Sequence, residues 1–262
     1  MPAMDDSPDY ERRFGGMARL YGPDALTRLK AAHVCVVGIG GVGSWAVEAL
    51  ARSGVGHLTL IDLDQVAESN MNRQIHAVED NLGKAKVAAM AERILSINPD
   101  CRIDLVDDFI TPENVDILIP VCDAVVDAID QVKAKVALAA LCRRRKQWLI
   151  TTGGAGGRTD PTRVKVDDLS RTTQDALASK MRASLRKDHG FSRDPKKKFN
   201  LPCVYSDEQI IRPQAGAACA VEGEAVAAPQ GLNCAGYGSA VTVTATFGFA
   251  AAARVLARLL QT

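Results

Sequence analysis

The chain has 262 residues, of which 47% are hydrophobic and 24% are charged, and its formal net charge is +1. These values are ordinary for a globular protein, and the length allows one large core or one domain with an appendage. Because the charges nearly cancel, the net charge does not indicate which kind of partner the protein binds.

The chain begins with an acidic and then basic stretch, "MPAMDDSPDYERRFGG", which has no apolar core and is therefore no signal peptide. We expect residues 1–32 to form an N-terminal helical arm. The main unit is predicted over 33–155, and an extension over 156–262 in the same globular unit.

Short apolar runs alternate with helical patterns through the first half of the chain, which predicts a parallel sheet covered by helices on both faces. The expected strands are 33–38, 57–62, 102–106, 123–128 and 148–152, and the expected helices are 44–56, 84–97 and 132–145. The Asn98-Pro99 pair should end the middle helix, because the residue before proline is disfavoured in helical geometry. The predicted fold class is α/β, a Rossmann-like, mixed and mostly parallel sheet that the C-terminal extension completes.

The regular alternation of strands and helices ends after residue 152. We predict a strand over 162–169, a helix over 174–187, a mobile basic loop over 188–200, short strands over 203–206 and 209–212, and a C-terminal helix. Residues 232–253 carry no charge, which is long enough to suggest a membrane span. Their polar residues and glycines favour a buried strand and helix instead, so membrane association is not expected.

Seven cysteines are scattered along the chain without a C-x-x-C pair. An odd number of cysteines without such pairs favours reduced thiols in the cytoplasm over a disulfide framework or a structural zinc site.

Positive charge is concentrated in one segment. Residues 180–199 hold eight Lys or Arg against two Asp, a local net charge of +6, so the rest of the chain sums to −5. A partner that contacts this segment would meet a basic surface, although a solvated loop would look the same. The cations of this segment include Arg182, Arg186, Lys187, Lys196, Lys197 and Lys198. The basic run 143–146 is ambiguous, since cations at a helix C-terminus are stabilising without any partner.

A glycine motif of the form G-x-G-x-x-G lies between the first strand and its helix. Glycines here let the backbone turn tightly and approach a phosphate at the helix N-terminus. Asp62 follows the last glycine by 19 residues, at the end of the second strand, where a carboxylate can bind ribose hydroxyls. The motif residues are Gly38, Gly40, Gly41 and Gly43.

Further polar residues follow successive strands, where they should share one edge of the sheet. Cations facing a phosphate site suit a triphosphate, and acids at two strand ends suit Mg²⁺. Each residue alone also has an ordinary explanation as a turn former, helix cap or solvated charge, and for Asn72 shaping the turn stays open beside a binding role. The candidates are Asp64, Asn70, Asn72, Arg73, Gln74, Lys86, Asp127 and Asp130.

The segments "GIGGVGSWAVEALARSGVGHLTLIDLD", "SNMNRQ", "GKAK" and "VVDAID" resemble the adenylate-forming domain of the ubiquitin-activating-enzyme superfamily, over about residues 10–155. The resemblance implies ATP as cosubstrate, with Gly41 on phosphate and Asp62 on the ribose. It further implies that Asn70, Arg73 and Lys86 hold the triphosphate and that Asp130 binds Mg²⁺. An N-terminal arginine of this superfamily reaches the neighbouring subunit's ATP site. Arg13 is the best match, with Arg12 adjacent, which implies a homodimer.

Other segments, among them "RRFGGMARLYG", "TTGGAGG", "DPTRVKVDDL" and "TVTATFGF", resemble the family of tRNA threonylcarbamoyladenosine dehydratases over nearly the whole length. That resemblance implies adenylation of the threonyl carboxylate of N6-threonylcarbamoyladenosine in tRNA, followed by ring closure with loss of AMP. It also makes the six cations of the segment 180–199 named above the candidate tRNA contacts, because Lys and Arg neutralise phosphates. It leaves room for a monovalent cation, K⁺ or Na⁺, near "TTGGAGG". It also leaves room for a cysteine-desulfurase sulfur-transfer system acting on Cys234, although Cys234 and Cys203 are more readily interpreted as small buried residues.

Three other functions stay open at this point. Activation of the C-terminal glycine of a sulfur-carrier protein is the main alternative, but members of that branch usually carry two C-x-x-C pairs, which this chain lacks. An NAD-dependent dehydrogenase would need a hydride site that no residue suggests. A non-catalytic tRNA-binding adaptor is also conceivable.

Overall fold

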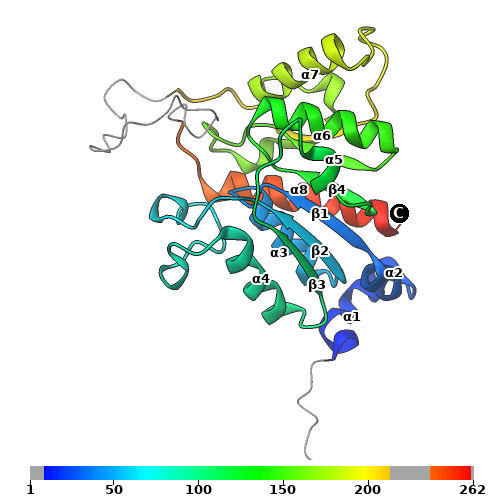
Figure 1. Ribbon diagram of the computed structural model, residues 1–262, viewed down its shortest axis with the longest axis vertical. Helices are drawn as coiled ribbons and strands as arrows, with labels where there is room; N and C mark the ends of the chain where they lie inside the picture. Colours follow the sequence, from blue (N-terminus) through cyan, green and yellow to red (C-terminus); the bar gives the residue numbers. More distant parts are fainter. Residues whose placement is uncertain (1–8, 213–236, 261–262) are drawn as a thin grey trace, which may run out of the picture.

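A computed structural model describes residues 9–212 and 237–260, which fold around a seven-stranded sheet (Figure 1). The strands are β1 (His33–Val37), β2 (His57–Ile61), β3 (Arg102–Val106), β4 (Ala124–Asp127), β5 (Leu149–Thr152), β6 (Val164–Asp168) and β7 (Pro202–Ser206). The helices are α1 (Tyr10–Tyr21), α2 (Ala25–Ala31), α3 (Gly43–Arg52), α4 (Lys86–Ile97), α5 (Val115–Leu118), α6 (Val132–Arg145), α7 (Ala176–Asp188) and α8 (Val241–Leu260). Short 3₁₀ turns lie at Glu68–Asn70, Glu79–Asn81, Pro161–Arg163 and Leu169–Arg171.

The sheet order is β3-β2-β1-β4-β5-β7-β6, and every neighbouring pair is parallel except β6 with β7. This confirms the predicted fold class. Parallel neighbours require crossover connections, and here the connections from β1 to β5 carry helices that cover the faces of the sheet.

Two apolar cores lie on opposite faces of the sheet, because successive side chains of a strand point in opposite directions. Val34 and Val36 of β1 pack with α3, α4 and α8, whereas Cys35 and Val37 pack with α5, α6 and α7. Both faces of the central strands are therefore buried, which explains why β1 and β4 are almost entirely apolar.

The first two helices lie at the amino ends of β1 and β2 (Figure 1). The side chain of Phe14 is buried against the α3–β2 connection, and the hydroxyl of Tyr10 donates to the carbonyl of Gly54 there. The N-terminal arm is thus attached to the end of the sheet opposite the carboxyl ends of the strands.

The C-terminal helix α8 packs most closely against α3. A Cβ at Gly248 would lie 2.5 Å from the carbonyl oxygen of Val42, so the absence of a side chain is what allows the two helices to approach. Of the described residues, only α8 forms a helix long and apolar enough to cross a membrane, and 56% of its apolar window is buried. The buried residues Val243, Phe247 and Val255 belong to the main core, which accounts for the apolar character of this helix.

Several local expectations are corrected by the structure. The segment 209–212 is no strand: the amide of Ile211 donates to Gly157, and the chain continues as an irregular loop. Residues 237–240 form no strand either, and 232–236 lie outside the described residues. The helices predicted from 84 and from 174 begin at Lys86 and Ala176.

The basic segment 188–200 is irregular, as predicted, but it is anchored by two aromatic side chains. Phe191 is buried, and its ring meets that of Phe199 edge-on at 5.0 Å. The guanidinium of Arg143 lies over Phe191 at 4.2 Å, and that of Arg186 over Phe199 at 5.3 Å. These contacts fasten the segment to the ends of α6 and α7.

Candidate nucleotide site

The glycine motif forms the turn from β1 into α3. Gly38 has φ +87°, a conformation that favours glycine, and a Cβ there would lie 2.9 Å from the carbonyl oxygen of Ala128. A Cβ at Gly43 would overlap the carbonyl oxygen of Gly38, so this glycine closes the turn against the helix. Gly38, Gly40 and Gly41 line a cavity, whereas Gly43 does not.

Asp62, at the end of β2, holds the glycine turn in place. One carboxylate oxygen accepts a hydrogen bond from the amide of Ile39 at 2.6 Å, and the other accepts from the amide of Asp64 at 2.9 Å. Burial raises the pKa of Asp62, while Lys86 and the two amides act in the opposite direction. The carboxylate lines the cavity, at the position expected for a ribose contact.

The segment "SNMNRQ" lies beside the N-terminus of α3. The indole of Trp45 donates to the carbonyl of Arg73 at 2.9 Å, and the Arg73 guanidinium donates to the carbonyl of Ser69 at 2.6 Å. The amide of Asn72 donates to the carbonyl of Ser239 at 2.9 Å, which ties this segment to the residues before α8. Asn72 therefore has a role in tertiary structure beyond shaping the turn.

Three polar side chains near this turn lack partners among the described residues. The buried Oε1 of Gln74, which lines the cavity, has no hydrogen bond, and neither do Ser44 Oγ or the two ring nitrogens of His76. Burial lowers the pKa of His76 to about 4, so its ring is neutral at pH 7. A buried amide oxygen without a hydrogen-bond partner is costly, and Gln74 also lines the cavity, so this residue is a candidate contact for a bound ligand.

Lys86 and two carboxylates form the charged side of the cavity. The ammonium of Lys86 is buried and lies 2.7 Å from Asp64 Oδ2. Asp130 follows β4 and faces the same cavity, and burial raises its pKa, with Asp64 acting in the same direction. A buried ammonium beside two carboxylates suits a phosphate chain with Mg²⁺, whose preferred ligands are carboxylate and phosphate oxygens.

The cavity has a volume of about 420 Å³, which is in the range of nucleotide-sized ligands. Ten of the twelve predicted nucleotide contacts line it, as do several residues that sequence reasoning did not nominate. Residues that follow a parallel strand are expected at this edge of the sheet, so those after β3 and β5 could have been predicted. No sequence signal indicates the lining residues that come from α7 and α8. The additional residues include Asp108, Phe109, Ile110, Leu177, Ser239 and Thr244, together with 152–156 of the segment "TTGGAGG", near which only a monovalent cation was expected.

Two predicted residues lie away from the cavity of their own chain. Arg13 donates to the carbonyl of Ile97 at 2.7 Å, at the end of the sheet opposite the cavity. The side chain of Asp127 is fully buried below the cavity, where Oδ2 lies 3.0 Å from Lys135 Nζ and accepts from the hydroxyl of Thr151 at 2.6 Å. Asp127 thus supports the site from beneath and does not line it.

Arg158, which sequence reasoning missed, fixes the glycine-rich loop that forms the far wall. Its guanidinium is buried and donates to four carbonyls, those of Gly154, Gln174, Ser206 and Glu208. It also lies 3.4 Å from Asp175, whose carboxylate caps α7 and accepts from the amide of Gly154. One side chain therefore joins the cavity wall to β7 and to the start of α7.

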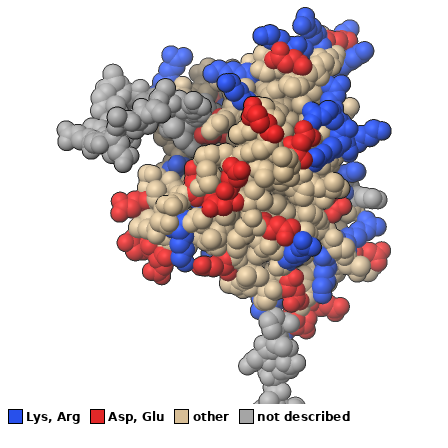
Figure 2. All heavy atoms as spheres, viewed as in Figure 1, with Lys and Arg blue, Asp and Glu red and all other residues tan. Residues whose placement is uncertain are grey.

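The six candidate RNA contacts divide into two groups. Arg182 donates to Leu169 and Thr172 and is half-buried, and Arg186 donates to the carbonyl of Ser192, so both hold local structure. The other four are exposed and have no side-chain partner among the described residues: Lys187, Lys196, Lys197 and Lys198. In Figure 2 basic side chains gather along the upper rim and upper right of the molecule, over α7 and the end of α6.

The basic residues of the run 143–146 contact other parts of the same chain. Arg144 and Arg145 pair with Asp116 of α5, and Arg145 also donates to the carbonyls of Asp116 and Ile119. Lys146 ends α6 in the left-handed conformation. These residues join α5 to α6.

Cys203 is buried in β7, and burial raises its thiol pKa far above the ordinary value, so it is not a reactive thiolate. Cys234 lies outside the described residues.

The fold and the cavity together define a Rossmann-like nucleotide-binding protein, with its ligand site at the carboxyl ends of parallel strands. Comparison with known proteins is more specific: the chain belongs to the ThiF family, whose profile matches residues 10–262.

The relatives are similar over nearly their whole length. The chain is 52% identical over 255 residues to the tRNA threonylcarbamoyladenosine dehydratase of Haemophilus influenzae, covering 97% of this chain and 95% of that protein. It is 52% identical over 257 residues to the Escherichia coli protein of the same name, covering 97% and 96%. A crystal structure of the Escherichia coli dehydratase in complex with ATP superposes with a TM-score of 0.86 at 50% identity, covering 97% of this chain and 96% of that one.

The buried ion pair below the cavity generates a testable prediction. Lys135→Met removes the ammonium and leaves the carboxylate of Asp127 buried without a charge partner, so the free energy of unfolding should fall by about 3–5 kcal/mol. Urea unfolding measures the effect.

Lys133→Met is the matched control, because Lys133 is exposed on the same helix, and its effect should stay within about 0.5 kcal/mol. Equal destabilisation by the two substitutions would contradict a structural role for the pair.

Proposed function

We propose that this chain is an ATP-dependent tRNA dehydratase that cyclises N6-threonylcarbamoyladenosine. The observation that carries the proposal is the nearly full-length similarity to proteins named for that activity, one of them solved with ATP. The same similarity favours this function over activation of a sulfur-carrier protein. The cavity supports it, because the predicted triphosphate-binding residues Asn70, Arg73 and Lys86 all line it.

In the proposed reaction an oxygen of the threonyl carboxylate attacks the α-phosphorus of ATP, and the bond to the β-phosphate breaks with release of pyrophosphate. The nitrogen of the modification then attacks the activated carbonyl carbon, loses its proton, and expels AMP. The substrate loses one oxygen and two hydrogens, the elements of water. ATP is consumed to AMP and pyrophosphate.

The residues of the cavity have distinct tasks in this scheme. The amides of the glycine turn and the N-terminus of α3 face the phosphates, while Asp62 takes the ribose hydroxyls. Lys86, Arg73 and Asn70 oppose the charge that develops on the phosphates as the bond breaks. Asp130, with Asp64 beside it, fits Mg²⁺ by its hard oxygen donors, and the ion would neutralise phosphate charge.

The tRNA would approach from the side of α7. The first turn of α7 contributes Leu177 to the cavity, and Lys187 lies ten residues further along, about 15 Å away at 1.5 Å per residue. The exposed lysines 196–198 follow on the anchored segment. A modified nucleotide in the cavity would therefore place neighbouring phosphates within reach of this basic surface.

The active unit in this proposal is a homodimer in the cytoplasm. Arg13 is too far from the cavity of its own chain to serve it, so its proposed place is the neighbouring subunit's site. The five cysteines of the described residues are free thiols, which supports a reducing compartment. A monovalent cation near residues 151–157 and sulfur transfer through Cys234 stay predictions.

Substitution of Lys86 tests the chemistry. Lys86→Met should lower AMP release by roughly 10²–10³-fold, because one preorganised cation is lost from the transition state, and Asp130→Asn should act in the same direction. The assay measures AMP together with the mass of the tRNA nucleosides, where dehydration removes the mass of one water.

Lys84→Met is the matched control, since Lys84 is two residues away, exposed, and paired with Glu92 at 2.9 Å. It should retain normal activity. Pyrophosphate exchange that depends on a sulfur-carrier protein, and is not stimulated by tRNA, would overturn the proposed substrate.

A mixed dimer tests the contribution of Arg13. Arg13→Ala and Lys86→Met homodimers should each be inactive, but a heterodimer has one complete site, built from the Lys86 of one chain and the Arg13 of the other. Activity should therefore return on mixing to about half of the wild-type level per heterodimer. Failure to complement, with heterodimers demonstrated by tags, would contradict a shared site.

Neutralising the exposed lysines tests the RNA surface. Lys196→Ala, Lys197→Ala and Lys198→Ala together should raise KM for tRNA and reduce the slope of log affinity against log salt by about 0.9 for each phosphate that the protein no longer neutralises. KM for ATP should not change. Lys30→Ala, on α2 at the far end of the sheet, is the control, and an equal effect there would contradict a localised RNA surface.

A further inference from the structure

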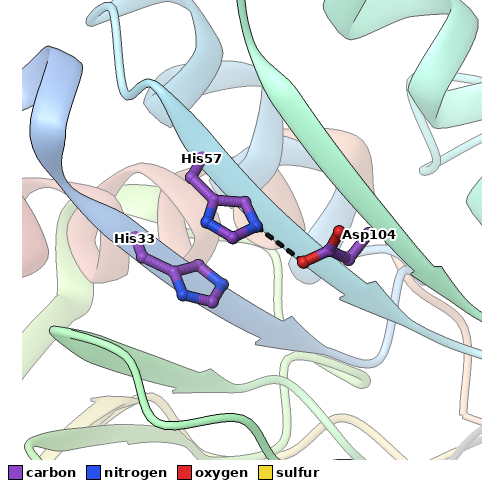
Figure 3. A group of neighbouring side chains, drawn as sticks. All are labelled: His33, His57 and Asp104. Carbon is purple, nitrogen blue, oxygen red and sulfur yellow. Dashed lines mark hydrogen bonds and ion pairs between the residues drawn. The ribbon is translucent and has the colours of Figure 1, made fainter.

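Two histidines and an aspartate meet on one face of the sheet, far from the nucleotide cavity (Figure 3). His33 and His57 are the first residues of β1 and β2 and are paired in register, and Asp104 lies on the neighbouring edge strand β3. The cavity begins about 16 Å further along β2, five residues on at about 3.3 Å each.

The side chains are close and mutually oriented. The two imidazole rings stack with centroids 3.5 Å apart and an interplanar angle of 9°. His57 Nε2 lies 2.6 Å from Asp104 Oδ2, and one nitrogen or oxygen atom from each of the three residues lies within 4.8 Å of the others. All three residues are partly exposed, so an ion from solvent can reach them.

Histidine binds metals as the neutral imidazole, through a ring lone pair, and each of the two rings offers one nitrogen to the cluster. The lone pairs of two stacked rings run parallel, so one ring must turn out of the stack before both nitrogens meet one ion. Two nitrogen donors and one oxygen donor are the ligand set of many sites with three protein ligands and a water.

We propose that His33, His57 and Asp104 form a binding site for a divalent first-row transition ion, with Zn²⁺ as the expected occupant. Two imidazoles favour such an ion over Mg²⁺, which prefers oxygen ligands. The site is thus distinct in place and in chemistry from the carboxylates that face the nucleotide cavity.

Binding requires two movements, a turn of one imidazole out of the stack and a shift of the Asp104 side chain. Donors at about 2.1 Å from a tetrahedral ion are about 3.4 Å apart, so Asp104 Oδ2 must withdraw from His57 by nearly an ångström. The side chain of Asp104 is 41% exposed on an edge strand and has room to do this. Arg102 contacts the other oxygen, Oδ1, at 3.3 Å, which leaves Oδ2 for the ion.

Surrounding groups hold the donors in place. The hydroxyl of Thr59 lies 2.8 Å from His33 Nε2, and the carboxylate of Asp123 accepts from the backbone amide of His33 at 2.8 Å. Thr59 is on β2 next to the cluster and is buried. An ion bound here would join the amino-terminal halves of three neighbouring strands.

Titration of the chelator-treated full chain with Co²⁺, in excess Mg²⁺, tests the proposal, because bound Co²⁺ reports its ligands in the visible spectrum. We expect one Co²⁺ per chain with nitrogen and oxygen ligation, displaced by Zn²⁺. His57→Ala and Asp104→Asn should each weaken binding by on the order of tenfold or more, and Thr59→Val by about tenfold. His189→Ala, in the exposed segment after α7, should bind as the wild type does.

Absence of Co²⁺ binding would overturn the site, as would unchanged affinity in both His57→Ala and Asp104→Asn. A spectrum dominated by sulfur-to-cobalt charge transfer would assign the ion to cysteines and equally overturn it. Melting curves without metal show whether each variant folds. Asp104→Asn conserves shape on a partly exposed side chain, so it decides the result if His57→Ala is unfolded.

Discussion

The parallel pairing of β2, β1, β4 and β5 is the constraint on which the rest of the structure depends. It brings the carboxyl ends of these strands to one edge of the sheet, so residues distant in sequence surround one cavity. The hydrogen bond from the amide of Ile39 to Asp62 depends directly on this pairing, because it joins the turn after β1 to the end of β2. A glycine turn without that anchor would sample many conformations, because glycine loses more backbone freedom on folding than any other residue.

Buried charges set the positions of the cavity walls. Asp127 and Lys135 lie beneath the loop that carries Asp130, and Arg158 fixes the glycine-rich loop on the opposite wall. Desolvation of such groups is costly, and only complete hydrogen bonding offsets it. The guanidinium of Arg158 contacts four carbonyls and one carboxylate. These contacts hold the glycine-rich loop in place, although the loop has few side chains of its own.

The two ends of the sheet differ in chemistry. The carboxyl ends present backbone amides, cations and hard carboxylates, a combination suited to phosphate and Mg²⁺. The amino ends present paired imidazoles on neighbouring strands, together with the N-terminal helices. The basic surface lies on a third side, over α7, whose last turn carries Lys187 and whose first turn contributes Leu177 to the cavity (Figure 2).

The sequence by itself determined the alternating strands and helices, the glycine turn, and the set of polar residues after successive strands. These features are local: each depends on periodicity or on the conformational preference of single residues, and strand-end residues converge in any parallel sheet. It did not predict that Asn72 binds the carbonyl of Ser239, that Arg158 organises the far wall, or that 209–212 is irregular. Nor did it unite His33 and His57 with Asp104, whose nearness comes from strand register. Only the tertiary structure decided these points, because they depend on contacts between segments distant in the chain, such as the 167 residues that separate Asn72 from Ser239, and no spacing within the chain encodes which distant groups will meet.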